Sequence, residues 1–171
     1  KTDPVSLYCS RPPLVETEAT QRAIALSELA ESPLFVVHVS TRGAMEATRD
    51  AYNRGLPVYG ETCTHYLTLN LENLAKRGND GFEGAKYICS PALRPQEHLD
   101  AMWEGIQRGW LTAVGSDHCA NAGGYEGAKK KGLGNFAKVP NGAPGVQDRL
   151  AMLWTQGVET GRLTKQKFVE I

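Results

Sequence analysis

The sequence predicts an α/β fold built on a parallel sheet, and three observations carry that prediction. Short apolar runs rich in β-branched residues alternate with longer segments whose apolar residues recur at helical spacing. Proline or glycine separates most of these segments. The chain has 171 residues, whereas a complete eight-stranded α/β barrel needs roughly 250. We therefore expect residues 1–171 to form one partial domain, about half of a TIM-like (β/α)8 barrel with four strands.

The first predicted helix covers residues 16–31, where the apolar side chains fall largely on one side of a helix, and Pro33 ends it. A nearly continuous apolar run follows, which is typical of a buried parallel strand. Gly55 then ends a second helical segment before another strand begins. The strand, helix and strand of this unit are expected at residues 34–39, 44–54 and 57–61.

The same pattern recurs after a polar connection. Residues 85–89 and 111–115 are predicted as strands, and between them residues 96–108 are predicted as a helix closed by a glycine. Residues 118–145 are rich in glycine with little periodicity, so we expect a long functional loop there. A last helix is expected from residue 146 to about 157.

Composition excludes several classes of partner. Lys and Arg total 19 and Asp and Glu total 19, so the net charge is zero and no basic field exists to attract nucleic acid or anionic lipid. The longest apolar runs are far shorter than the roughly 18 residues that a transmembrane helix requires. The four cysteines are too sparse for a disulfide framework, which favours a soluble protein of the cytoplasm.

Both ends of the sequence have the character of cuts. The chain begins at Lys1 without an initiator Met, and residues 165–171 form an amphipathic run with no stop signal. Half a barrel would expose unpaired strand edges and apolar helix faces. We therefore expect the chain by itself to associate or aggregate.

Four polar residues stand at the carboxyl ends of predicted strands, where α/β barrels place their catalytic groups. His38 interrupts an apolar strand and could bind a metal through one imidazole nitrogen. Asp117 could ligate a cation or take a proton from bound water, as a hydrolase requires. Glu61 and Ser90 occupy the two other strand ends.

Each candidate also has a structural interpretation. A single histidine in a strand is more often a hydrogen-bonded core residue, Asp117 could cap the following turn, and Glu61 could pair with a neighbouring Arg or Lys. His65 and His118 are alternative metal ligands, whereas His98 opens a helix and is expected to be solvated. Packing is the role expected of the three tryptophans, Trp103, Trp110 and Trp154.

Six runs of the sequence together resemble the hydantoinase/dihydropyrimidinase family of cyclic amidohydrolases. They span almost the whole chain in compatible order and spacing, which is a far stronger signal than one short motif. The six runs are SRPP (10–13), FVVHVS (35–40), VYGETC (58–63), GAKYICSP (84–91), VGSDHC (114–119) and VPNGAPG (139–145).

The resemblance implies a metal-dependent barrel that opens a cyclic amide ring. Its two divalent metals, usually zinc, are bridged by a carboxylated lysine and a hydroxide. His38 matches the last histidine ligand, and Asp117 matches the aspartate that ligates the other metal and serves as general base. Ser90 and Asn141 match positions whose main-chain groups hold the cyclic amide or imide. The resemblance also implies a homotetramer.

Part of the implied site is missing from the sequence. Nothing in this chain matches the family's His-X-His pair, its bridging lysine or its other histidine ligand, which come from earlier strands. With His38 and Asp117 alone the chain should bind metal weakly and be inactive. The loop at residues 120–135 also departs from the family, because Ala120 to Gly124 stand where relatives have Pro and Phe after the cysteine.

Other readings stay open. Dihydroorotases and allantoinases share the barrel, and residues 61–67 also resemble allantoinase, whereas residues 86–91 and 140–142 favour hydantoinase or dihydropyrimidinase. The non-catalytic neuronal relatives of dihydropyrimidinase keep the fold as assembly proteins, although His38 and Asp117 argue against that role. An unrelated soluble α/β domain is the remaining possibility.

Overall fold

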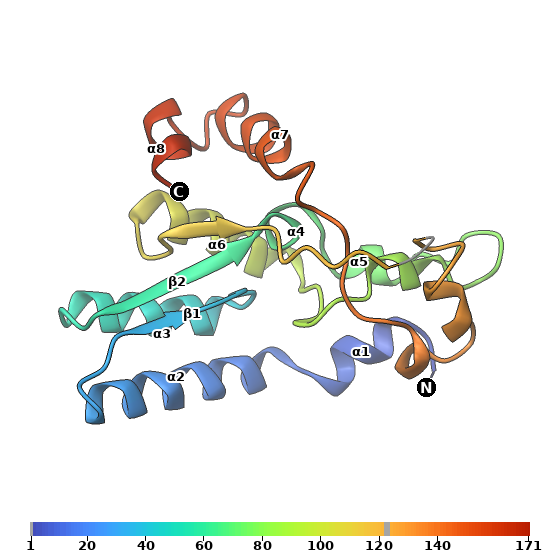
Figure 1. Ribbon diagram of the computed structural model, residues 1–171, viewed down its shortest axis with the longest axis horizontal. Coiled ribbons are helices and arrows are strands. Elements are labelled where there is room, and N and C mark those ends of the chain that lie inside the picture. The colour runs from blue at the N-terminus through green and yellow to red at the C-terminus, as the bar shows by residue number, and fades with distance from the viewer. Residues whose placement is uncertain (1, 122–123) are drawn as a thin grey trace.

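A computed structural model describes residues 2–121 and 124–171 and confirms the α/β fold with a parallel sheet (Figure 1). Ala122 and Gly123, part of the loop that departs from the family, lie outside the described residues, as does Lys1. The helices are α1 (Val5–Ser10), α2 (Pro13–Leu29), α3 (Arg42–Asn53), α4 (Thr64–Thr68), α5 (Leu71–Leu74), α6 (Gln96–Arg108), α7 (Arg149–Leu153) and α8 (Lys165–Glu170). The strands are β1 (Leu34–Val36), β2 (Val58–Cys63) and β3 (Ala113–Gly115).

The sheet has the order β1-β2-β3, and β2 pairs in parallel with both neighbours. Phe35 lies opposite Tyr59 in one ladder, and Thr62 lies opposite Val114 in the other. The carboxyl ends of all three strands therefore point to the same side, toward α1 and α5 (Figure 1). That edge is where an α/β barrel gathers its functional side chains.

Local signals explain where the main helices begin and end. Thr41 caps α3, because its Oγ1 accepts a hydrogen bond from the Ala44 amide at 3.3 Å. Pro13 stands at the start of α2, where its missing amide hydrogen costs nothing. Gly109 closes α6 in the left-handed region, with φ of 76°. The helices α2, α3 and α6 thus lie near the positions predicted for them.

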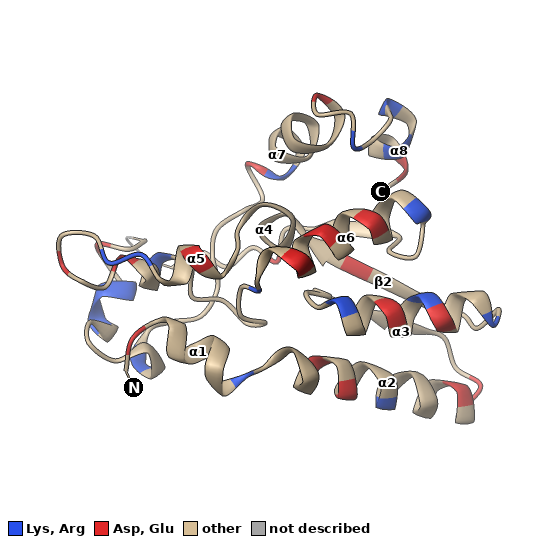
Figure 2. Cartoon of the chain, turned by 180° about the vertical axis from the view of Figure 1, so that it is seen from behind, with Lys and Arg blue, Asp and Glu red and all other residues tan. Residues whose placement is uncertain are grey.

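Two main cores hold the elements together. The first lies between the sheet and the helices α3 and α6, and includes Met45, Met102 and Val114. The second lies beside the strand ends and includes Tyr66 and Ile88. Charged residues lie mainly along the helices, and Figure 2 shows them on α2, α3 and α6. The strands carry a single charged residue, at position 61 of β2.

The strand predicted at residues 85–89 is wrong. Residues 85–87 lie in a 3-10 helix, η1 (Glu83–Tyr87), and residues 88–89 have no regular secondary structure. The start of η1 is bonded through its backbone to the residues after α5 and not to a sheet. The Gly84 amide donates to the Lys76 carbonyl at 2.8 Å, and a Cβ on Gly84 would lie only 2.0 Å from the Leu74 carbonyl oxygen. Short apolar runs do not distinguish a buried strand from other buried segments. The sheet consequently has three strands in the described part of the chain, not the four expected.

Other boundaries also differ from the expectation. The strand expected at residues 34–39 ends at Val36, so one residue, Val37, separates the end of β1 from His38. The last helix begins at Arg149 and passes into a π-helical turn, η4 (Trp154–Val158). The loop at 118–145 contains two short 3-10 helices, η2 (Lys129–Gly132) and η3 (Phe136–Lys138). The short helices α1, α4 and α5 were not expected.

The tryptophans pack as expected. Trp103 is buried in the first core, and its Nε1 donates to the Leu67 carbonyl at 3.0 Å. Trp154 meets the ring of Phe168 edge-on, with centroids 5.4 Å apart. Trp110 packs against the same core from its rim. Within residues 2–121 and 124–171, no helix combines the length and the apolar character needed to cross a bilayer.

Candidate functional site

His38 and Asp117 share an uncommon backbone conformation. Their φ angles are 44° and 42°, and in the described part of the chain Glu31 is the only other non-glycine residue with a positive φ. Such a conformation costs roughly 1–2 kcal/mol per residue. Strained backbone of this kind tends to occur where a side chain has to be aimed for function. His38 follows β1 and Asp117 follows β3, so the conformation marks the two outer strand ends.

Beyond the third strand end lies His65, the second residue of α4, which begins directly after β2. Burial lowers the pKa of His65 to about 4, while the Asp117 carboxylate raises it and His38 lowers it by smaller amounts. Both strand-end residues are therefore near the His65 ring. The Nε2 atom of His65 is buried and has no hydrogen-bond partner among the described residues. The edge between His38 and Asp117 thus holds a polar atom that this chain leaves unsatisfied.

The side chains of His38, His65 and Asp117 offer part of the ligand set of a metal site. Imidazole nitrogen and carboxylate oxygen are both zinc ligands, but a catalytic zinc has three protein ligands. No group of three or more His, Cys, Asp or Glu side chains suited to a metal exists among residues 2–121 and 124–171. The unsatisfied Nε2 of His65 leaves it available as the alternative ligand that its position suggested. Further donors would have to come from outside these residues.

The side chains of His118 and Glu61 are engaged in contacts within the protein. The Nδ1 of His118 accepts hydrogen bonds from the amides of Gly145 at 3.2 Å and Val146 at 3.3 Å. His118 therefore holds the 143–146 segment, and one of its nitrogens is already occupied. Glu61 forms no ion pair with any described residue, so the expected Arg or Lys partner is not found. Its carboxylate instead packs over Gly115, where a Cβ would lie 2.7 Å from the Glu61 carboxyl carbon.

The structure brings the two predicted ring-binding residues together. Ser90 Oγ donates a hydrogen bond of 2.9 Å to Asn141 Oδ1, and Arg11 Nη1 donates to Ser90 Oγ at 2.5 Å. Arg11 belongs to the SRPP run, but nothing in the sequence indicated this contact. Arg11 is exposed and has no acidic partner within the described residues.

Lys129 is a second residue that sequence reasoning missed. Its side chain is buried, and Nζ donates to the carbonyls of Ile88 at 2.9 Å and Pro140 at 3.2 Å. Burial is the main reason that the pKa of Lys129 is lowered from 10.5. The ammonium joins the two segments that lead into Ser90 and Asn141. Nothing in the lysine-rich loop marked Lys129 as the one that is buried.

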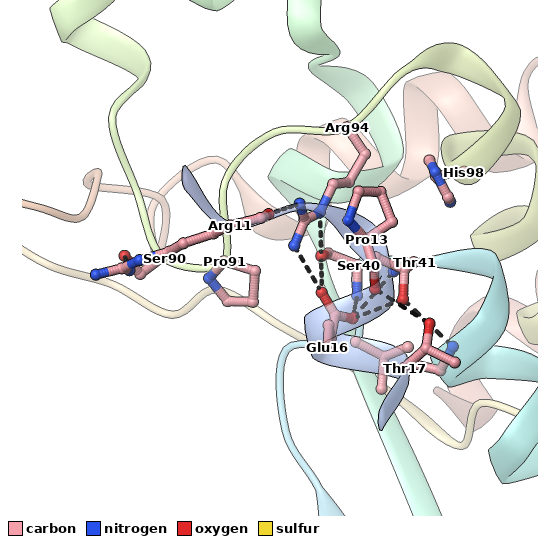
Figure 3. Close-up of polar contacts among 12 residues, drawn as sticks. Arg11, Pro13, Glu16, Thr17, Ser40, Thr41, Ser90, Pro91, Arg94 and His98 are labelled. Atoms are coloured by element: carbon pink, nitrogen blue, oxygen red, sulfur yellow. Dashed lines mark hydrogen bonds and ion pairs between the residues drawn. The ribbon is translucent and has the colours of Figure 1, made fainter. Parts of the chain in front are cut away.

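The expectation that His98 is solvated is wrong. His98 is 9% exposed, and its Nδ1 accepts a hydrogen bond of 2.9 Å from the amide of Arg42. Arg42 is the first residue of α3, so the imidazole satisfies one of the amides that a helix start leaves free. The first turn of α6 carries His98 to this place, next to Arg94 and Thr41 (Figure 3).

The four cysteines are free thiols. Cys89 is buried in the second core, and burial raises its pKa to about 11. Burial likewise raises the pKa of Cys63. Both thiols stay protonated near neutral pH, which does not suit a nucleophile.

Comparison with known proteins gives consistent relatives. No protein-family model matches the chain. The D-hydantoinase of Geobacillus stearothermophilus is 46% identical over 170 residues, which make up 99% of this chain and 35% of that protein. The D-hydantoinase of Ralstonia pickettii is 43% identical over 171 residues, covering 100% of this chain and 36% of that protein.

Solved structures give the same result. The dihydropyrimidinase from Brevibacillus agri NCHU1002 matches with a TM-score of 0.94 at 44% identity, over 99% of this chain and 36% of that one. An L-hydantoinase (dihydropyrimidinase) from Arthrobacter aurescens matches with a TM-score of 0.88 at 31% identity. The chain spans little more than a third of the length of these relatives. Across that third the sequence is 31–46% identical and the fold matches with TM-scores of 0.88 and 0.94, and the chain belongs to the D-hydantoinase/dihydropyrimidinase family.

Proposed function

We propose that the complete protein, meaning this chain together with the parts of its relatives' fold that it does not span, hydrolyses a C–N bond in a cyclic amide. The substrates would be dihydropyrimidines or 5-substituted hydantoins, whose rings it would open. One observation carries the proposal. His38 and Asp117 stand in strained backbone at strand ends on one edge of the sheet, in a chain similar to D-hydantoinases and a dihydropyrimidinase.

His38 and Asp117 would be ligands in a site for two divalent ions, for which we favour zinc. The remaining ligands, including a carboxylated lysine that bridges the ions, would lie outside this chain. Such ions polarise an amide carbonyl and supply hydroxide near neutral pH. The 171-residue chain by itself has too few ligands, so we expect it to bind metal weakly and to be inactive.

Asp117 would move the proton of the reaction. Its carboxylate takes the proton released when a water oxygen adds to the amide carbonyl carbon. It then gives that proton to the ring nitrogen as the C–N bond breaks. The opened product carries a new carboxylate at the carbonyl carbon and a new N–H at the former ring nitrogen.

Ser90 and Asn141 would hold the ring. A cyclic amide edge presents neighbouring donors and acceptors, which main-chain groups of the two residues can bind without a charged side chain. The side-chain hydrogen bond between them keeps both segments at one spacing. A ring that fits this spacing is then held with its carbonyl toward Asp117.

Ring opening by the complete protein is the test. The protein is stripped with a chelator, reloaded with zinc, and assayed on dihydrouracil, a 5-substituted hydantoin, allantoin and dihydroorotate. We expect zinc to restore opening of the first two rings. Asp117→Asn should lower kcat by a factor on the order of 10² to 10⁴, because the proton has no acceptor. Asp100→Asn, an exposed aspartate of α6, is the matched control and should leave kcat unchanged.

The other outcomes separate the alternatives. Activity on allantoin or dihydroorotate alone would mean an allantoinase-like or dihydroorotase-like hydrolase, which residues 61–67 left open. A zinc-loaded protein that opens none of the four rings would mean a non-catalytic assembly protein. We further propose that the complete protein is cytoplasmic and a homotetramer; sedimentation tests the tetramer, and cell fractionation tests the location.

A further inference from the structure

Glu16 and Arg94 form an ion pair against Ser40 and Thr41 (Figure 3), which lie in the turn that follows His38. Arg94 Nη2 is 3.1 Å from Glu16 Oε2, and the two side chains are only 3% and 15% exposed. Glu16 comes from α2 and Arg94 from the segment before α6, so the pair joins parts of the chain that are 78 positions apart. None of the site residues predicted from the sequence belongs to this pair.

The Glu16 carboxylate holds the turn through its backbone. Oε1 accepts hydrogen bonds from the amides of Ser40 at 2.7 Å and Thr41 at 3.0 Å. Oε2 accepts from the Ser40 hydroxyl at 2.5 Å. Because Thr41 is the N-cap of α3, the carboxylate also faces the positive end of that helix dipole. Both amides after Val39 are therefore fixed by one side chain.

The Arg94 guanidinium extends the contact to the ring-binding side. Nε donates to Ser40 Oγ at 3.1 Å, and Nη1 donates to the Arg11 carbonyl at 2.6 Å. The side chain of Arg11 then donates to Ser90 Oγ. A continuous set of hydrogen bonds thus runs from the turn after His38 to Ser90.

Energetics favour a geometric role for this pair. Removing two charges from water costs about as much as their attraction returns, so a buried ion pair adds little net stability. The pair does restrict geometry, because its hydrogen bonds have fixed directions. A second pair on the same helix shows the contrast. Arg22 and Glu18 are also 3.1 Å apart, but they are 66% and 58% exposed and join no other segment.

We propose that Glu16 and Arg94 are positioning residues that fix the turn after His38 and, through Arg11, the distance between His38 and Ser90. The strained backbone of His38, with φ of 44°, needs such support on the side of the turn. Between His38 and the turn, the Val39 amide donates a hydrogen bond to the carbonyl of Glu61 on β2 at 2.7 Å. The inference rests on the proposed function, because it takes His38 as a metal ligand.

The test compares two matched pairs of variants in the complete protein. Glu16→Gln removes the negative charge of the buried pair, and Arg94→Lys keeps the positive charge but removes the forked guanidinium contacts. Glu18→Gln and Arg22→Lys make the same two changes in the exposed pair on the same helix. Zinc affinity is measured by competition with a chromophoric chelator. We expect the buried-pair variants to bind zinc roughly 10- to 100-fold more weakly, as when support of a metal ligand is removed. The exposed-pair variants should bind zinc like the wild type.

A second readout needs no metal. Amide hydrogen exchange at Ser40 and Thr41 is followed in the metal-free protein, together with unfolding by urea. We expect faster exchange at these two amides in Glu16→Gln, beyond any change in global unfolding. Ser40→Ala keeps the ion pair but removes its hydroxyl contacts, and serves if Glu16→Gln does not fold. It should weaken zinc binding by a smaller factor.

The outcomes separate this inference from the proposed function. Wild-type protein that binds zinc, with buried-pair variants that bind it equally tightly, would overturn the positioning role alone. Wild-type protein that binds no zinc would overturn the proposed function and the role of His38 in it. In that case, faster exchange at Ser40 and Thr41 in Glu16→Gln would still support the conclusion that Glu16 holds the turn. Unchanged exchange would overturn that conclusion as well.

Discussion

Ser90 Oγ donates a hydrogen bond of 2.9 Å to Asn141 Oδ1, although the two residues are 51 positions apart. Lys129 reinforces this contact, because its Nζ donates hydrogen bonds to the carbonyls of Ile88 and Pro140, the residues close before Ser90 and Asn141. The two segments therefore lie at a spacing that is set before any ring is bound. If Ser90 and Asn141 hold the ring as proposed, this fixed spacing would spare the ordering cost of binding.

Loss of the Ser90–Asn141 bond should weaken ring binding. Asn141→Ala leaves the Ser90 hydroxyl without its acceptor and removes one of the hydrogen bonds that hold the 139–145 segment. In the complete protein we expect KM for the ring substrate to rise about threefold to tenfold, as for one hydrogen bond of roughly 1 kcal/mol. The value of kcat should change less, because the bond is the same in the ground and transition states. The exposed Asn79→Ala is the control, and an unchanged KM in Asn141→Ala would contradict the expectation.

The sequence predicted the parts of the fold that depend on local pattern. The helices α3 and α6 have clear periodicity with Gly55 and Gly109 after them, and both lie within a few residues of the expected place. The strand ends at His38 and Asp117 could be found because a polar residue interrupts or follows an apolar run. The error at residues 85–89 arose because burial alone does not specify a strand.

The remaining features depend on contacts between distant segments. Glu16 is one of several acidic residues on α2, and only the folded chain shows that it meets the amides of Ser40 and Thr41. Lys129 and His98 similarly have ordinary sequence surroundings and buried positions in the structure. Tertiary packing decides which polar residues are buried, and a single sequence carries little information on it.

Substitution at Gly84 should destabilise the chain strongly. A Cβ there would lie 2.0 Å from the Leu74 carbonyl oxygen, and the backbone of η1 or α5 would have to move. We expect Gly84→Ala to lower the free energy of unfolding at the upper end of the roughly 1–3 kcal/mol typical of overpacking. Urea unfolding measures the loss.

Gly81→Ala is the comparison for Gly84→Ala. Gly81 has φ of 73° but no atom within 4 Å of an added Cβ, so the substitution introduces strain without a clash. Its cost should be about 1 kcal/mol. Equal losses in the two variants would mean that the contact between Gly84 and Leu74 is not tight in solution.

His98 should make stability fall in mild acid. Burial is the main reason that its pKa is lowered from 6.5, so the folded protein binds fewer protons than the unfolded protein below that pH. The contribution of neutral His98 is complete above 6.5 and is lost as the pH falls through the lower folded pKa. Protonation at Nδ1 would also remove the acceptor for the Arg42 amide.

The measurement is the free energy of unfolding in urea between neutral pH and about pH 5, for wild type and His98→Asn. Asn can still accept from Arg42 but does not titrate. The variant should show a smaller loss on acidification. His65 contributes to the slope in both proteins, so the difference between the two curves isolates His98. Parallel curves would contradict the expected role.

Self-association of the isolated chain should use the open face of the sheet. Phe35 and Tyr59 are register partners on β1 and β2, and they are 50% and 48% exposed. Beside them, α2 and β1 line an open groove of about 310 Å³ that includes Val37. A β1 edge with unpaired amides and carbonyls lies along the same groove. This face offers another molecule both apolar contact and hydrogen bonds.

Phe35→Lys combined with Tyr59→Lys should weaken that association about tenfold or more, since burying the exposed half of each ring is worth roughly 1 kcal/mol. Sedimentation of the 171-residue chain measures it, and Tyr52→Lys, a 54% exposed tyrosine of α3, is the control. A wild-type chain that is a monodisperse monomer with sharp thermal unfolding would contradict the idea. In the complete protein the same double variant should be harmful and lower the free energy of unfolding. There the rest of the barrel would cover the open face, so the two lysines would be buried without partners.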